Sequence, residues 1–339
     1  MSFVVNTFEG RAGDRAGTVY ELTDGAVRAE VWPQWGFNCV RWQVRQPDGS
    51  WAGVFFTAPD WETNPVPTRS GHPVLFPFPG RLRDGRLNAG GKTYQLPLND
   101  STKQHAIHGF TPRTPWRVVG SQSGAASATV TGEFRLAEDF PAAVGQWPGD
   151  FVFTLSYTLH RDRVRVDAAV ENRGSEAVPF GLGYHPYFRL PGVTDADVGG
   201  HILTAHVAQV WEADAANLPT GVRKDVTEEL DFRFPRPVGA TALDHVFTGV
   251  TAAVGPGELV ELATLTHPAS PGRLRVLADP AFRDLVLFTP AHRQAVAIEP
   301  YSCSADASNL LARGIDSGWR AVGPGDKWEA AVEYRWEVG

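Results

Sequence analysis

A two-residue alternation of apolar and polar side chains is the feature of this sequence that most limits its possible folds. In FVFTLSYTL, residues 151–159, an apolar side chain occupies every second position. After a turn at Arg161-Asp162, the alternation resumes over residues 164–170. Successive side chains of a β-strand point to opposite faces, so the pattern predicts a β-hairpin with one face toward a core.

The last residues of the chain repeat this alternation. We expect one face of a final strand to carry Trp328, Ala330, Val332, Tyr334, Trp336 and Val338, and the other face to carry Glu329, Glu333, Arg335 and Glu337. Because the first set is apolar and the second is charged, the two faces of the strand should have different surroundings.

Frequent turn signals divide the sequence into short segments. They occur at Asp24-Gly25, Pro47-Asp48-Gly49, Asp84-Gly85, Gly90-Gly91, Arg173-Gly174 and Pro271-Gly272. Helical periodicity is scarce, and ADASNLLA, residues 305–312, is the best helix candidate. Short strands between such turns favour an all-β sandwich or barrel with few short helices. No composition break or linker interrupts the strand pattern, so we expect residues 1–339 to form a single domain.

Composition narrows the expected partners and compartment. The net charge is −7 and no basic cluster stands out, so we expect neither nucleic acid nor an anionic membrane as a partner. No apolar run approaches the ~18 residues of a membrane span, and the N-terminal residues lack the apolar run of a signal peptide. Two cysteines, Cys39 and Cys303, are too few for a disulfide framework or a thiolate metal site. These features predict a cytoplasmic protein.

The segment FGLGYHPYFRL, residues 180–190, holds the first candidate for a chemical role. Gly181 and Gly183 leave little side-chain bulk beside His185, and Pro186 restricts the histidine to extended backbone angles. Imidazole titrates near neutral pH, so a histidine in such a segment suits acid–base chemistry in a sugar pocket. A structural histidine packed in an aromatic core is the alternative interpretation.

A second candidate lies in GHPVLFPFPGRLRDG, residues 71–85, where proline enters the strand pattern. Proline cannot donate to a central ladder, so we expect this run at a sheet edge or in a loop that lines a cleft. Arg81 follows Gly80 within it, and its guanidinium is suited to hydrogen-bonding the hydroxyl groups of a ligand. An ordinary surface arginine is the alternative.

The third candidate is Glu299, which follows the apolar run 295–298 and precedes Pro300. A carboxylate that ends such a run should lie at a strand end, partly removed from water. Burial of this kind raises the pKa of a carboxyl group and suits it to the role of general base. The alternative is a glutamate that lies in water at the end of its strand.

A histidine–carboxylate metal site is a further interpretation. His105 and His108, with His185 and Glu299, are residue types that bind metal ions. Positions i and i+3 of a strand face opposite sides, however, so we expect no metal. The sequence also lacks a dinucleotide-binding glycine motif, a P-loop and a G-x-S-x-G motif, which disfavours nucleotide cofactors and a serine nucleophile.

Taken in order along the chain, FPFPGRL, HAIHGF with Trp116, GLGYHPYF, LDHVF and AIEPYS resemble the aldose 1-epimerase (galactose mutarotase) family. The matching segments extend from about residue 70 to residue 310, and HPYF and the late Glu-Pro are the most specific. The resemblance implies a large twisted antiparallel β-sandwich with an open cleft. It also implies a reaction on a small-molecule sugar that requires no cofactor.

The resemblance also implies roles for individual residues. His185 matches the general acid and Glu299 the general base of the ring opening that interconverts the α and β anomers of a free aldohexose. Arg81, His108 and Asp244 match residues that bind the sugar.

One departure from the family pattern concerns the sugar preference. Many relatives have asparagine immediately before the arginine, where this chain has Gly80, so the resemblance leaves the preferred sugar open. Three aromatic residues near the motifs, Phe76, Tyr184 and Tyr187, are candidates to stack on the apolar face of the sugar.

Other activities fit parts of the pattern. A hexose-6-phosphate 1-epimerase would need cationic groups near the phosphate, and Arg69, Arg83, Arg86 and Arg189 are the candidates. A non-catalytic sugar-binding β-sandwich would need no acid–base pair, which His185 and Glu299 supply. A glycoside hydrolase would use two carboxylates, such as Glu299 and Asp244, and would leave His185 without a role.

Overall fold

The structure, a computed structural model, describes residues 2–252, 255 and 257–339. Within these residues β-strands predominate, and the α-helices are α1 (Leu136–Asp139) and α2 (Ala307–Ala312). The predicted all-β class is therefore confirmed. The helix expected over residues 305–312 is also present, and it begins two residues later than expected.

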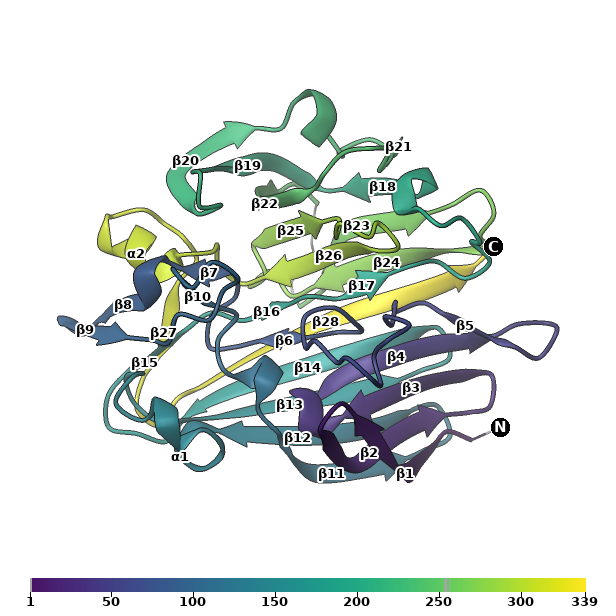
Figure 1. Ribbon diagram of the computed structural model, residues 1–339, viewed down its shortest axis with the longest axis horizontal. Helices are drawn as coiled ribbons and strands as arrows, with labels where there is room; N and C mark the ends of the chain where they lie inside the picture. The colour runs from purple at the N-terminus through teal and green to yellow at the C-terminus, as the bar shows by residue number, and fades with distance from the viewer. Residues whose placement is uncertain (1, 253–254, 256) are drawn as a thin grey trace.

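The largest sheet in the described part of the chain has nine strands and extends along the whole molecule (Figure 1). In spatial order they are β11 (Arg117–Ser123), β12 (Ala128–Arg135), β13 (Phe151–Leu159), β14 (Arg163–Asn172), β28 (Lys327–Val338), β24 (Gly272–Ala278), β23 (Val260–Thr266), β18 (Ile202–Ala205) and β21 (Arg236–Pro237). The C-terminal strand β28 lies at its centre, so the end of the chain joins strands from both halves of the sequence.

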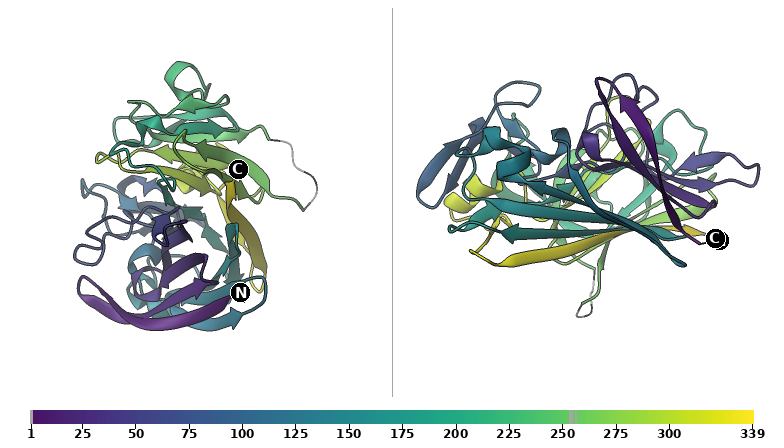
Figure 2. Two further views of the ribbon diagram at one scale, coloured as in Figure 1. Left: turned by 90° about the vertical axis from the view of Figure 1, so that its right-hand side faces the viewer. Right: turned by 90° about the horizontal axis from the view of Figure 1, so that it is seen from below.

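Two further sheets pack against one face of this long sheet (Figure 2). One has five strands near the N-terminus: β1 (Val4–Ala12), β2 (Arg15–Thr23), β3 (Val27–Trp32), β4 (Asn38–Arg45) and β5 (Trp51–Gly53). The other contains, in order, β20 (Pro219–Asp225), β19 (Val207–Ala213), β22 (Asp244–Val250), β25 (Asp284–Phe288), β26 (Val296–Tyr301), β16 (Gly183–Tyr184) and β6 (Val74–Leu75), while β17 (Tyr187–Phe188) also pairs with β26. A buried apolar cluster from Phe3 to Trp336 joins the layers.

The described residues also form three two-stranded ladders. They are β7 (Arg81–Leu82) with β10 (Ala106–Ile107), β15 (Val178–Phe180) with β27 (Arg320–Val322), and β8 (Arg86–Ala89) with β9 (Lys92–Gln95). All pairs of named strands in the described residues are antiparallel, so the predicted antiparallel sandwich is confirmed.

The strands predicted from alternation are present, with two differences in burial. The hairpin of residues 151–170 forms β13 and β14, which pair from Phe151 opposite Asn172 to Leu159 opposite Val164. In β28, however, Val338 is 67% exposed because it ends the strand, and Glu333 is buried. The Glu333 carboxylate receives hydrogen bonds from Arg165 and Arg335, which compensate for its removal from water.

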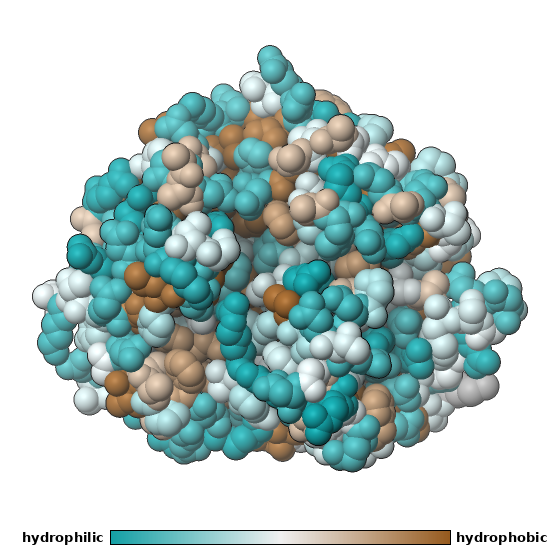
Figure 3. Space-filling view, in the orientation of Figure 1, coloured by the Kyte–Doolittle hydropathy of each residue, from teal (hydrophilic) through white to brown (hydrophobic). Residues whose placement is uncertain are grey.

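The surface and the cysteines add little constraint on function. Figure 3 shows one face covered mostly by hydrophilic residues, with small scattered apolar patches. Cys39 and Cys303 are buried and unpaired. Among the helices of the described residues, none has the length and apolar character needed to cross a membrane.

Candidate active site

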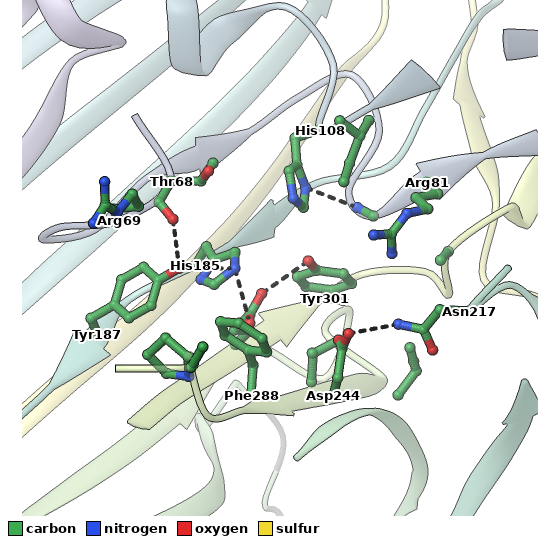
Figure 4. Close-up of a pocket in the computed structure, with 18 of the residues that line it drawn as sticks. Thr68, Arg69, Arg81, His108, His185, Tyr187, Asn217, Asp244, Phe288 and Tyr301 are labelled. Atoms are coloured by element: carbon green, nitrogen blue, oxygen red, sulfur yellow. Dashed lines mark hydrogen bonds and ion pairs between the residues drawn. The ribbon is translucent and has the colours of Figure 1, made fainter. Parts of the chain in front are cut away.

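A pocket of about 540 Å³ opens beside β26, β25 and β22 (Figure 4). Its volume falls within the usual range for small-molecule sites, which is roughly 300–1,000 Å³. All five residues predicted to act on or bind the sugar line this pocket: Arg81, His108, His185, Asp244 and Glu299. The structure therefore brings together side chains that are far apart in the sequence.

Strand register places His185 opposite Glu299. The short strands β16 and β17 both pair with β26, Gly183 opposite Tyr301 and Tyr187 opposite Ala297. The residue midway between the two pairs is His185, and its counterpart on β26 is Glu299. The imidazole Nε2 lies 3.3 Å from Glu299 Oε1. Because the pairing register is fixed on both sides, the backbone itself determines this contact.

The pair is almost completely removed from water. His185 is 7% exposed and Glu299 is 1% exposed. Burial lowers the pKa of His185 to about 3, and burial raises the pKa of Glu299 well above its ordinary value, as predicted for the carboxyl group. Both shifts have the same cause, since burial penalises the charged form of each group. Burial therefore favours the neutral form of each group.

Two tyrosines contact the pair from opposite ends. The Tyr301 hydroxyl donates a hydrogen bond to Glu299 Oε2 at 2.9 Å. The Tyr187 hydroxyl donates to the Thr68 carbonyl oxygen at 2.6 Å and lies 3.4 Å from His185 Nε2. Sequence reasoning missed the Tyr301 contact, although residues i and i+2 of a strand share a face and Tyr301 is two residues after Glu299.

Gly183 makes room for the Tyr301 ring. A Cβ atom at Gly183 would lie 2.7 Å from Tyr301 Cδ1 and 2.6 Å from Pro79 Cβ, closer than such atoms can approach. Gly181, by contrast, accommodates the sulfur of Cys303, which a Cβ atom would meet at 2.2 Å. The two glycines beside His185 thus serve different neighbours, and Gly183 is the one that supports the site.

The ladder of β7 and β10 brings Arg81 and His108 together, with Arg81 opposite Ile107. The backbone N–H of His108 donates to the Gly80 carbonyl oxygen at 2.9 Å, and the backbone N–H of Gly80 donates to the imidazole Nδ1 of His108 at 3.3 Å. Since Nδ1 accepts, the proton of the neutral ring is on Nε2. Burial, followed by the nearby His185, Arg113 and Arg81, lowers the pKa of His108 well below its usual value. His108 is therefore a neutral donor.

Asp244 begins β22 and pairs with Phe288 at the end of β25. Asn217 Nδ2 donates to its carboxylate at 2.8 Å. Desolvation raises the pKa of Asp244, and the positive charge of Arg81 opposes this shift. Asn217 and Phe288, which also line the pocket, carried no recognisable signal in the sequence. Their place depends on strand pairing that only the structure shows.

Two of the three aromatic candidates for sugar stacking lie elsewhere. Phe76 is fully buried and stacks on Phe153 at 4.2 Å between ring centroids. Tyr184 is also fully buried and packs on His72 at 4.7 Å. Successive strand residues face opposite sides, which directs Tyr184 into the core while His185 faces the pocket. Tyr187 does line the pocket.

The metal interpretation and most of the phosphate candidates receive no support from the geometry. His105 does not line the pocket, and its Nδ1 accepts a hydrogen bond from the Asp84 N–H. Across residues 2–252, 255 and 257–339, no cluster of three or more His, Cys, Asp or Glu side chains is arranged to hold a metal ion.

Among the four arginines considered for a phosphate, Arg69 lines the pocket and the other three do not. Arg83 is paired with Asp214 and Asp306, Arg189 bonds the Asp195 carbonyl oxygen, and Arg86 is exposed on β8.

The fold and the site together define an antiparallel β-sandwich with a buried histidine–glutamate pair in its pocket. Comparisons with known proteins identify the family. The model of the aldose 1-epimerase family matches residues 18–335. The chain therefore belongs to the aldose 1-epimerase family.

Individual relatives agree with this assignment. The chain is 29% identical to the uncharacterized protein YihR of Escherichia coli over 72% of each chain. It is 24% identical to mouse galactose mutarotase over 74% of this chain and 70% of that protein. Among solved structures, a galactose mutarotase-like protein from Clostridium acetobutylicum has a TM-score of 0.85 at 23% identity, with 99% of each chain covered. At that identity the likeness establishes the fold alone.

Proposed function

We propose that this protein is an aldose 1-epimerase that interconverts the α and β anomers of a free aldohexose. The observation that carries the proposal is the buried contact of 3.3 Å between His185 Nε2 and Glu299 Oε1 in a pocket of about 540 Å³. Acid–base catalysis of ring opening needs a proton donor and a proton acceptor within reach of one sugar, and this contact supplies both.

The proposed reaction moves only protons and one carbon–oxygen bond. Glu299 takes the proton of the C1 hydroxyl while protonated His185 gives a proton to the ring oxygen. The bond between C1 and the ring oxygen breaks and the aldehyde forms. After rotation about the C1–C2 bond, the reverse proton transfers close the ring to the other anomer. No redox step occurs, so we propose that the enzyme needs no cofactor.

The protonation of the pair is consistent with this assignment of roles. A neutral carboxyl beside a neutral imidazole holds the same number of protons as a carboxylate beside an imidazolium. Transfer of one proton from Glu299 to His185 Nε2 therefore converts the resting pair into the reactive ion pair. Oε1 is the Glu299 oxygen that faces His185 Nε2, at 3.3 Å, so the proton moves along this contact.

Binding and orientation are assigned to the polar side chains around the pair. In this proposal the Arg81 guanidinium and His108 Nε2–H donate to sugar hydroxyls, and the Asp244 carboxylate accepts from them. Phe288, whose ring lies edge-on to His185 at 5.8 Å, is the side chain we assign to the apolar face of the sugar. Positioning of the substrate in this way contributes to rate as well as to affinity.

A free sugar is favoured over a phosphosugar. Arg69 is the one candidate phosphate arginine that lines the pocket in the described structure, whereas strong phosphate sites commonly combine several donors. A non-catalytic sugar-binding protein would have no use for the buried His185–Glu299 contact, which carries the cost of desolvating two ionisable groups.

Two further proposals concern the whole chain. We propose that residues 1–339 form one domain, and the apolar cluster from Phe3 to Trp336 supports this organisation. We propose the cytoplasm as its compartment, since two unpaired cysteines fit a reducing environment.

Polarimetry of freshly dissolved sugars tests the function. α-Glucose, α-galactose and glucose 6-phosphate would be followed with wild type and with Arg69→Ala. We expect acceleration on a free aldohexose that does not require Arg69. Acceleration on the phosphate ester alone, lost in Arg69→Ala, would instead establish a phosphosugar epimerase. Binding of a sugar without acceleration on any aldose would establish a sugar-binding protein.

A further inference from the structure

The two tyrosines that contact the catalytic pair have hydroxyl groups with opposite hydrogen-bonding roles. Tyr301 donates to Glu299 Oε2 at 2.9 Å. A donor at this position stabilises the carboxylate more than the neutral carboxyl. Tyr187 uses its own proton on the Thr68 carbonyl oxygen at 2.6 Å, so it offers only a lone pair to His185 Nε2 at 3.4 Å. A lone pair at this position stabilises a proton on Nε2.

Both contacts oppose the effect of burial. Removal from water favours the neutral carboxyl and the neutral imidazole, yet the proposed reaction requires the carboxylate and the imidazolium. We infer that Tyr301 and Tyr187 are positioning residues that stabilise the charge-separated form of the pair, Glu299 carboxylate beside His185 imidazolium. The expected effect of the two tyrosines on catalysis rests on the proposed function. Their expected effect on the protonation of Glu299 and His185 does not.

The local structure holds both hydroxyl groups in place. The Tyr301 ring fits against Gly183, where any side chain would collide with it. Tyr187 stacks on the His185 ring with centroids 4.7 Å apart and planes at 20°. Replacing either tyrosine by phenylalanine preserves ring packing and removes the hydroxyl alone.

Several other ionisable groups also affect the ionisation of Glu299. The groups whose charge or hydrogen bond acts on Glu299 are His185 and Tyr187 from the segment of β16 and β17, Tyr301 on its own strand, Asp244 from β22 and Tyr334 from β28. The negative charge of Asp244 opposes ionisation of Glu299, and Tyr301 lowers the pKa of Glu299. The Tyr301 hydroxyl itself stays protonated, because burial and the Glu299 charge raise its pKa well above the usual value.

Infrared spectroscopy across a pH titration tests the inference directly. The carbonyl band of the neutral Glu299 carboxyl is assigned by its absence in Glu299→Gln. Wild type, Tyr301→Phe and Tyr187→Phe are then compared. We expect the neutral band to persist to higher pH in Tyr301→Phe, by about one pH unit, a tenfold change in the ionised fraction. In Tyr187→Phe we expect a stronger neutral band near pH 7, because proton transfer from Glu299 to His185 becomes less favourable. With the substrate found by polarimetry, kcat near pH 7 should fall about tenfold while KM stays within about twofold.

Tyr184→Phe is the matched control. The Tyr184 hydroxyl is buried without a hydrogen-bond partner in the described residues and lies in the core beside His72. Its removal should leave both the band and kcat at their wild-type values.

The outcomes separate this inference from the proposed function. A neutral band with the same strength and the same titration pH in wild type and in both folded tyrosine variants would overturn the inference, even if wild type accelerates anomerisation. A shifted band in a protein that accelerates no sugar would uphold the inference and refute the function. If Tyr301→Phe does not fold, Tyr187→Phe alone decides the question.

Discussion

At the scale of single residues, some residues of the pocket could be identified from the sequence, but the contacts between them could not. His185 and Glu299 could be selected from the sequence because each stands beside a proline in a distinctive motif. Their contact could not be predicted, because it depends on β16 and β17 pairing with β26 in one register. Asn217 could not be found at all, since it lies in a loop whose contact with Asp244 has no sequence signature.

Arg81→Ala should weaken sugar binding without disrupting the fold. The Arg81 side chain is 25% exposed and lines the pocket, while its neighbour Asp100 keeps hydrogen bonds from the Gln104 and His105 N–H groups. Hydrogen bonds to charged groups contribute roughly 1.5–3 kcal/mol, so KM should rise about 10- to 100-fold. Steady-state kinetics would measure this, with Arg86→Ala, exposed and outside the pocket, as the control. An unchanged KM would exclude Arg81 as a binding residue.

At the scale of elements, long strands were predictable and short ones were not. The alternation in β13, β14 and β28 extends over seven or more residues and indicates strands by itself. The site, however, is framed by β6, β7, β10, β16 and β17, each of two residues. Two residues cannot show a period, so the frame of the site was visible only as motifs rich in proline and glycine.

Gly183→Ala should damage the site through the packing of β16 against β26. The new methyl group would lie within 2.7 Å of both Pro79 Cβ and Tyr301 Cδ1, so these neighbours or the β16 backbone must shift, which disturbs the contact of Tyr301 with Glu299. Inserting a methyl group into a full core typically costs about 1–3 kcal/mol of unfolding free energy. Urea denaturation should show this loss, and the anomerisation rate should fall with it. Gly120→Ala is a control for a glycine outside the core, because Gly120 has no positive φ and a Cβ atom there would meet only Thr131 Cβ, at 4.0 Å. Wild-type stability and rate in Gly183→Ala would contradict the packing argument.

At the scale of the whole molecule, a buried histidine connects the layers. The His72 ring nitrogens lie 2.9 Å from the hydroxyl groups of Tyr157 on β13 and Tyr334 on β28. The same ring packs on Tyr184, which directly precedes His185 in the sequence. His72 therefore ties the long sheet to the segment that carries the site. Sequence reasoning did not single out His72, because its partners come from distant strands.

His72 should also make stability depend on pH. Burial lowers the pKa of His72 to about 3, so the folded protein keeps this imidazole neutral at pH values where the unfolded chain binds a proton, below about 6.5. The contribution of His72 to stability is therefore complete above about pH 6.5 and decreases toward pH 3. The loss is about 1.4 kcal/mol per pH unit in that window.

Urea unfolding at pH 7, 6 and 5 measures this contribution. The free energy of unfolding of His72→Gln should fall less steeply with decreasing pH than that of wild type, whatever the variant loses at pH 7. Parallel pH dependences would show that His72 is not kept neutral by the fold.

The most direct test of the whole account is the anomerisation rate of the preferred aldose, measured by polarimetry with Glu299→Gln, His185→Asn and the double variant. A positioned acid or base typically contributes about 10²–10⁴-fold, so each single variant should lose that much of the catalysed rate. Because the two residues act as one unit, the double variant should be little slower than the slower single variant. A wild-type rate in either single variant would contradict the central claim that this buried pair performs the chemistry.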